Sequence, residues 1–175
     1  MTMTVAQLDT MPDMEAAFKL AACCGSAKWV AEMVRRRPYL TRARVLSTAE
    51  EVAADLEGKD WLESFSHHPR LGEGSAAARV SSDAAVWASG EQSRVSRISG
   101  AVRSALVEGN IQYERRFGFI FIISAEGRDP DAILLALLER LENTSEDEMA
   151  IAVQEQRKIM MLRLEKLIPA PGTSA

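Results

Sequence analysis

Apolar side chains recur at helical spacing along most of the chain. Residues 14–22 have apolar positions three and four apart, and Gly25 follows as a stop signal. Ser26 is placed to cap a second helix, which Pro38 ends. The basic run Arg35–Arg37 falls at the C-terminal end of that helix, where the helix dipole favours cations. We therefore expect a solvated helix end there rather than an anion site.

Two further helices are predicted by the Ser-x-x-Glu spacing of a capping box. Ser47 and Glu50 have this spacing and predict a helix that begins at Ser47 and ends near residue 57. Ser145 and Glu148 have it too, and predict the start of the longest helix, which reaches about residue 167. A short helix is expected over residues 59–65, before a loop rich in proline and glycine.

One segment, Phe117–Ile123, has the pattern of an extended chain. The sequence contains no second convincing strand, so this segment has no partner to complete a ladder of backbone hydrogen bonds. Asn110 and Tyr113 share a helix face just ahead of it and are placed to hold it by hydrogen bonds. Asp129–Pro130 then begins another helix, to about residue 142. We predict a buried extended segment between helices, with backbone groups left for another partner.

Composition supports a helical fold, because alanine, leucine, methionine and glutamate are common. We predict an all-α, single-domain helical bundle of about eight helices with one short extended segment. This domain is expected to span residues 12–168, with a flexible N-terminus over 1–11 and a tail over 169–175. A chain of 175 residues has enough length for a hydrophobic core.

Charge and hydropathy argue against several classes of protein. The formal net charge of −4 is opposite to the basic surface that nucleic-acid binding requires. A hydrophobic content of 47% is too high for a disordered chain. No apolar run approaches the roughly 20 residues that span a bilayer, and the N-terminus does not have the pattern of a secretion signal. We expect a cytoplasmic protein that binds neither nucleic acid nor membrane.

The candidate chemistry is concentrated in few residues. The cysteines Cys23 and Cys24 are adjacent and are expected to be inert thiols. The histidines His67 and His68 are also adjacent, in the Pro/Gly loop, and form a poor metal chelate. A loop histidine can shuttle protons at neutral pH, although a histidine on a surface loop is more often an inert group. Nucleotide-binding and serine-hydrolase motifs are absent.

Glu91–Gln92 stands near the start of a predicted helix, where the dipole alone would favour a carboxylate. The alternative is a carboxylate that orients a histidine beside an amide that binds a heterocycle.

Several short motifs, taken in order, resemble one family, the 2-oxo-4-hydroxy-4-carboxy-5-ureidoimidazoline (OHCU) decarboxylases. The resemblance covers roughly residues 12–168. It is carried by Cys23-Cys24-Gly25-Ser26 with Trp29, Arg37-Pro38, Phe65-x-x-His68-Pro69-Arg70-Leu71-Gly72, Glu91-Gln92, Asn110-x-x-Tyr113-x-x-x-Phe117-Gly118-Phe119, Gly127-Arg128 and Arg140-Leu141-x-Asn143.

The resemblance implies an all-helical homodimer without cofactor or metal that converts OHCU to (S)-allantoin and carbon dioxide in urate breakdown. It assigns catalysis to His68, which precedes Pro69, and to Glu91. It assigns substrate binding to Gln92, to Pro69 and to the backbone of the Phe-rich stretch Phe119, Ile120, Phe121, Ile122 and Ile123. Arg163 is a further candidate, because it continues a helical stripe with Gln156 and Ile159; a plain surface arginine is the alternative.

One position departs from the family pattern, since Ala88 stands where the family usually has a serine. One substrate hydrogen bond is expected to be missing there or replaced by water. The alternative function is a non-enzymatic helical binding or scaffold module, and a metal-dependent hydrolase is a weaker third possibility.

Overall fold

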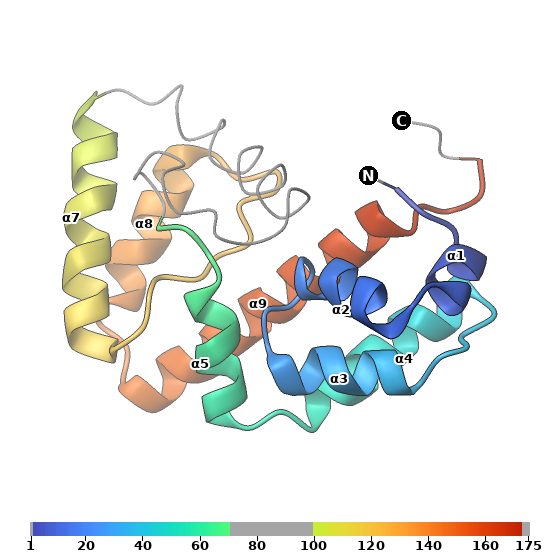
Figure 1. Cartoon of the computed structure of the whole chain (residues 1–175). Helices are drawn as coiled ribbons and strands as arrows, with labels where there is room; N and C mark the ends of the chain where they lie inside the picture. The colour runs from blue at the N-terminus through green and yellow to red at the C-terminus, as the bar shows by residue number, and fades with distance from the viewer. Residues whose placement is uncertain (1, 71–99, 173–175) are drawn as a thin grey trace. The chain divides into compact units, whose positions relative to one another are not determined.

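A computed structural model of the chain describes residues 2–70 and 100–172. These residues form eight helices and no strand (Figure 1), which confirms the predicted all-α class. None of the helices in the described ranges is long and apolar enough to cross a membrane. The helices are α1 (Val5–Thr10), α2 (Asp13–Ala21), α3 (Ala27–Arg35), α4 (Arg42–Ala54), α5 (Gly58–Ser66), α7 (Gly100–Phe117), α8 (Pro130–Arg140) and α9 (Ser145–Leu167).

The chain divides into two compact units. The first comprises Met1–Ser64 and Arg157–Ala175, and so contains α1 to α4, most of α5 and the second half of α9. The second comprises Phe65–Gln156, with α7, α8 and the first half of α9.

In the first unit, α3 packs against both α2 and α4. The Ser26 side chain accepts the backbone N–H of Trp29, so the predicted cap of α3 is confirmed. Trp29 is fully buried, and its indole N–H donates to the Ala49 carbonyl of α4 at 3.1 Å. The largest side chain of the α3 apolar face is therefore fixed by packing and by a hydrogen bond.

The predicted start of α4 at Ser47 is wrong. The helix begins at Arg42, after Thr41, whose hydroxyl accepts the backbone N–H of Arg44 at 3.2 Å. Ser47 lies inside the helix, where its hydroxyl donates to the Arg44 carbonyl at 3.3 Å. The Ser-x-x-Glu pattern marks a cap only where the backbone before it leaves helical geometry. Here that break occurs earlier, at Leu40, which has a φ of 67°.

The sequence predicts a flexible N-terminus over residues 1–11, but residues 5–10 form α1. Thr4 and Gln7 make a reciprocal capping box at its start. Leu8 of this helix is fully buried. The Arg37 side chain donates to the carbonyls of Leu8 at 2.6 Å and Met11 at 2.9 Å. Arg37 is thus not the solvated helix end that was expected, because it bonds the C-terminal carbonyls of α1.

In the second unit, α7 and α8 lie side by side (Figure 1). A Cβ atom at Gly109 of α7 would come within 2.7 Å of Leu137 Cδ2, so the glycine permits a close approach. At the C-terminal end of α7, Arg116 donates to the carbonyl of Asn143, which follows α8, at 3.1 Å. α8 begins as predicted, with the Asp129 side chain accepting the N–H of Asp131.

α9 begins where it was predicted, but its cap differs. Thr144 Oγ1 accepts the backbone N–H of Asp147 at 3.2 Å, whereas the predicted cap was Ser145 paired with Glu148. Glu148 instead has no exposed surface. Its carboxylate is directed into the unit, where it meets α7 and α8.

The α4 boundary gives a test of stability. Thr41→Ala removes the observed cap and is expected to lower the free energy of unfolding by about 1 kcal/mol. Ser47→Ala removes the predicted cap and is expected to change it by less than about 0.5 kcal/mol. Urea unfolding followed by circular dichroism compares the two variants. A larger loss for Ser47→Ala than for Thr41→Ala would contradict the observed boundary.

Candidate functional site

The two histidines follow α5 directly and differ in exposure. His67 is exposed, whereas His68 is partly buried. The His68 N–H donates to the Phe65 carbonyl at 3.0 Å, which closes a turn. Two residues later, the Arg70 guanidinium bonds both oxygens of Glu114 on α7, each at 2.9 Å. This two-point ion pair holds the end of the histidine loop against α7.

An aromatic cluster brings the histidine loop to the Phe-rich segment. The ring centroids of Phe65 and Phe119 are 5.3 Å apart. Tyr113 of α7 lies 5.7 Å from Phe119 and 5.2 Å from Phe121, edge to face in both pairs. Such geometry favours contact between the positive edge and negative face of the rings. The predicted catalytic loop and the predicted binding segment thus share one packed cluster.

The predicted extended segment begins at Phe117, but Phe117 is the last residue of α7. The remaining part, Phe119–Ile123, is neither helix nor strand, and its Phe119, Phe121, Ile122 and Ile123 side chains are buried. In the part of the chain that the structure describes, only the Ile122 carbonyl of this segment has a backbone hydrogen bond. It accepts from Arg140 Nη1 at 2.8 Å. Just beyond the segment, the Ser124 N–H donates to Glu155 Oε2 at 2.8 Å. The backbone of this segment therefore retains donors and acceptors that a ligand can use.

A buried polar network around Arg140 contacts the segment at the Ile122 carbonyl. Glu148 Oε1 accepts from Arg140 Nε at 2.8 Å and from Arg140 Nη2 at 2.6 Å. The same oxygen accepts the Tyr113 hydroxyl, and Asn143 donates to Oε2 at 2.8 Å. Arg140 is 8% exposed and Glu148 is 0% exposed. Each charge is therefore compensated, as a buried ion pair requires. Burial, and then the bond to Glu148, raise the pKa of Tyr113.

Other predicted site residues lie elsewhere. Ala88, Glu91 and Gln92 are outside the described residues. Pro69 follows His68 in the second unit. Arg163 belongs to the first unit, where it is 6% exposed and donates through Nη1 to the Ala22 carbonyl at 3.3 Å. Arg163 is thus a buried arginine, in keeping with its place on the helical stripe, and not a plain surface one.

The cysteines have the environment expected of inert thiols. Neither forms a disulfide, and both are buried. Cys24 Sγ lies 3.4 Å from Ser64 Oγ. Burial raises the pKa of the Cys24 thiol, which disfavours the reactive thiolate. Among the described side chains, no group of three or more His, Cys, Asp or Glu residues could hold a metal ion.

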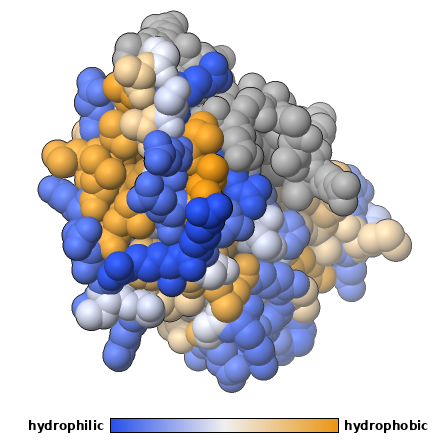
Figure 2. Space-filling model, turned by 90° about the vertical axis from the view of Figure 1, so that its left-hand side faces the viewer, coloured by the Kyte–Doolittle hydropathy of each residue, from blue (hydrophilic) through white to orange (hydrophobic). Residues whose placement is uncertain are grey.

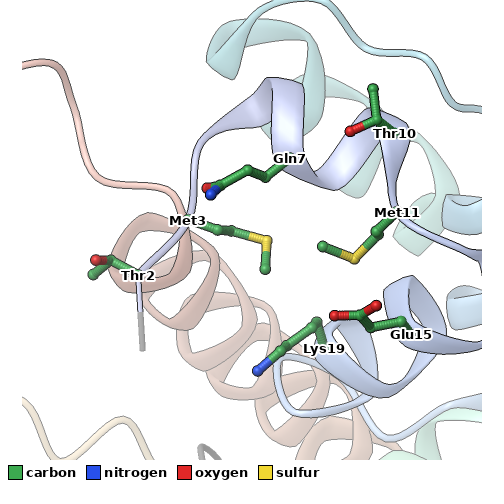
Figure 3. Close-up of a pocket in the computed structure, with 7 residues that line it drawn as sticks. All are labelled: Thr2, Met3, Gln7, Thr10, Met11, Glu15 and Lys19. Carbon is green, nitrogen blue, oxygen red and sulfur yellow. The ribbon is translucent and has the colours of Figure 1, made fainter.

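A pocket of about 340 Å³ lies in the first unit between α1 and α2 (Figure 3). Met3 and Met11 extend into it, and Glu15 and Lys19 of α2 lie along its lower side. It contains none of the predicted site residues and no histidine. We therefore do not assign the predicted chemistry to this pocket.

Sequence reasoning missed the two acids that serve the Phe-rich segment, Glu148 and Glu155. The spacing of Glu148 from Ser145 predicts a cap, and no sequence motif includes Glu155. Both lie on one face of α9 with Ala152, which is fully buried. The sequence shows only their spacing, which places both acids on the same helix face as Ala152.

Comparisons with known proteins identify one family. The family model described as OHCU decarboxylase matches residues 9–165. The chain is 40% identical, over 83% of its length, to the uric acid degradation bifunctional protein TTL of Arabidopsis thaliana. It is 31% identical, over 78% of its length, to the 2-oxo-4-hydroxy-4-carboxy-5-ureidoimidazoline decarboxylase of Haloferax volcanii, and covers 79% of that relative.

A solved structure agrees over nearly the whole chain. A crystal structure of OHCU decarboxylase in the presence of (S)-allantoin superposes with a TM-score of 0.74 and 34% identity, covering 91% of this chain and 100% of that one. Some relatives are longer: the chain spans 45% of the Arabidopsis protein and 59% of an OHCU decarboxylase from Amia calva.

The tyrosines give a pH-dependent prediction. Burial raises the pKa of both tyrosines of the chain, Tyr39 and Tyr113. The folded state therefore favours the neutral phenols. Their contribution to stability is complete below the unfolded pKa of about 10 and is lost as the pH rises above it. We expect tyrosinate absorbance to appear only together with loss of far-ultraviolet circular dichroism. In a Tyr39→Phe variant, ionisation of Tyr113 near pH 10 without unfolding would contradict its burial.

Proposed function

The chain belongs to the OHCU decarboxylase family, and from that premise we propose that it converts OHCU to (S)-allantoin and carbon dioxide during urate breakdown. The observation that supports this best is the shared aromatic cluster. Through Phe65 and Phe119, it joins the loop of His68 to a segment with available backbone groups. A proton-transfer group beside a polar but uncharged binding surface suits a small heterocyclic substrate.

The reaction requires that one bond break and that one proton be delivered. The carbon–carbon bond to the carboxylate breaks, carbon dioxide leaves, and the electron pair enters the adjacent C=N and carbonyl system of the substrate. Because the substrate itself delocalises this charge, the reaction needs no external electron sink. The protein has to hold the substrate, stabilise the developing anion and direct the proton to one face.

His68 is our candidate for the proton transfer. An imidazole has an ordinary pKa of about 6.5 and can both accept and donate a proton near neutral pH. The turn to Phe65 and the Arg70–Glu114 pair restrict the loop that carries it. Its exposed neighbour His67 lies on the same loop and is assigned no role.

The backbone of Phe119–Ile123 is our candidate for holding the ureido and ring amides of the substrate. These groups are planar donors and acceptors, and backbone N–H and C=O groups complement them at fixed positions. The buried side chains of the segment keep those positions fixed by packing.

Further roles rest on the family resemblance. We assign Glu91 to orienting and polarising His68, and Gln92 and Pro69 to substrate contact. Arg163 would pair with the substrate carboxylate. Ala88 would leave one substrate hydrogen bond missing, which at about 0.5–1.5 kcal/mol weakens binding without abolishing activity.

The family resemblance also implies a homodimer, and the second unit has an apolar surface that a second copy would bury. Ile111 of α7 and Leu135 and Leu138 of α8 are 42%, 57% and 51% exposed. Figure 2 shows hydrophobic side chains gathered on this face. Contiguous apolar surface of this kind usually marks an interface. The cytoplasmic location remains a prediction from sequence.

The role of His68 is tested against its neighbour. His68→Asn is expected to lower kcat/KM for OHCU by about 100- to 10,000-fold, because it removes the proton-transfer group. His67→Asn, the matched control, is expected to stay within about twofold of wild type, since an exposed surface substitution has little effect. Formation of (S)-allantoin is followed by circular dichroism with freshly generated OHCU. Near-wild-type activity of His68→Asn would refute the assignment, and a wild-type chain that does not accelerate OHCU decay would favour the non-enzymatic alternative.

The dimer surface is tested by measuring mass in solution. We expect light scattering to give wild type twice the chain mass of 19.2 kDa. The double variant Leu135→Arg with Leu138→Arg is expected to be monomeric, because it would bury four like charges across a two-fold interface. Leu62→Arg on α5, where Leu62 is 40% exposed, is the control. A double variant that remains dimeric would place the interface elsewhere.

A further inference from the structure

We infer that Glu155 and Arg140 are positioning residues, which clamp the Phe-rich segment so that the backbone groups of Phe121 and Ile123 meet the substrate. This inference rests on the proposed function and deepens it, because it states which edge of the segment binds and what holds the other edge.

The segment needs such a clamp because it has no strand beside it. Within the described residues, no ladder of backbone bonds restrains it. An unrestrained residue gains roughly 1–2 kcal/mol of backbone entropy, and a binding surface made of backbone atoms would lose its geometry. Burial of the aromatic side chains restricts the segment but does not by itself set the direction of each N–H and C=O.

Glu155 supplies the first restraint. Its side chain comes from α9, is 6% exposed, and accepts the Ser124 N–H at 2.8 Å. Its other oxygen lies 3.5 Å from Arg128 Nη2, which is consistent with an ionised carboxylate. A hydrogen bond to a charged acceptor is about twice as strong as a neutral one. The chain is therefore held firmly just after the segment ends.

Arg140 supplies the second restraint, from α8. Nη1 donates to the Ile122 carbonyl at 2.8 Å, and the guanidinium carbon lies 4.5 Å from the centroid of the Phe121 ring. Glu148 bonds the same guanidinium through Nε and Nη2, which fixes its plane. One side chain thus restrains both the backbone and a ring of the segment.

The two restraints fall on alternate residues, and this alternation sets the binding edge. In an extended chain, the N–H and C=O of residues i and i+2 point to one edge, and those of residues i+1 and i+3 point to the other. Ile122 and Ser124 are bonded on the clamped edge. The backbone groups of Phe121 and Ile123 are therefore presented on the opposite edge.

The test removes the Ser124 restraint and measures ligand affinity. Glu155→Leu is expected to raise both the Kd for (S)-allantoin and the KM for OHCU by about tenfold, the usual effect of losing a bond to a charged group. Glu155→Gln keeps an acceptor oxygen and is expected to raise them only about two- to threefold. Glu146→Gln, an exposed change of the same charge on α9, is the control and should match wild type.

A loss of stability and a loss of positioning in Glu155→Leu give different results. A variant that is only less stable would contain fewer folded molecules, so the number of binding sites would fall while Kd and KM stayed at the wild-type values. Isothermal titration calorimetry measures both the number of sites and Kd, and so distinguishes the two cases. Amide hydrogen exchange at Ser124, measured without ligand, is expected to accelerate in Glu155→Leu while the α7 core amide of Leu106 stays protected. Arg140→Lys is a second variant, which keeps the charge but cannot bond Glu148 through two nitrogens and the Ile122 carbonyl through a third.

Two outcomes would overturn the inference, and they differ from failure of the proposed function. Unchanged Kd and KM in Glu155→Leu, in a wild-type background that does turn over OHCU, would show that the clamp does not serve binding. Unchanged exchange at Ser124 would show that Glu155 does not restrain the backbone. A wild-type chain without OHCU turnover would contradict the proposed function itself and remove the binding role assigned to Glu155.

Discussion

The second unit depends on one constraint: the chain leaves α7 at Phe117 and reaches α8 at Pro130 without forming a helix or a strand. Backbone groups in a buried segment need hydrogen-bond partners, and these usually come from regular structure. Here the Ile122 carbonyl and the Ser124 N–H are paired instead with side chains of α8 and α9. The cluster around Tyr113 then fills the space between the segment and α7.

A buried ion pair makes this arrangement possible and also costs stability. Glu148 and Arg140 are removed from water, and a pair of apolar residues of equal size would often be as stable or more so. An apolar pair could not bond the Ile122 carbonyl, however, nor accept the Tyr113 hydroxyl. The network thus gives a specific geometry to a segment that apolar packing alone would leave adaptable.

Local signals in the sequence were sufficient for most of the helices. Ser26 and Asp129 begin helices as predicted, because a cap acts within three residues and needs no distant partner. The same signal failed at Ser47, where an earlier break in the backbone preceded it. It also misled at Glu148, whose spacing from Ser145 fits a cap although its partners lie on α7 and α8. A pattern of neighbours cannot distinguish an acid that bonds its own helix end from one that bonds another helix.

The candidate site was harder to identify from residues alone, for a related physical reason. His68 differs from His67 through its burial and its turn to Phe65, and both depend on packing that the sequence does not display. The proposed binding groups are less visible still, because they are backbone atoms that every residue carries. The side chains of the Phe-rich segment report only that it is buried. The two edges of the segment differ in their hydrogen bonds, because the Ile122 carbonyl is bonded to Arg140 and the Ser124 N–H to Glu155. The binding edge therefore follows from these partners, and not from which side chains Phe121 and Ile123 carry.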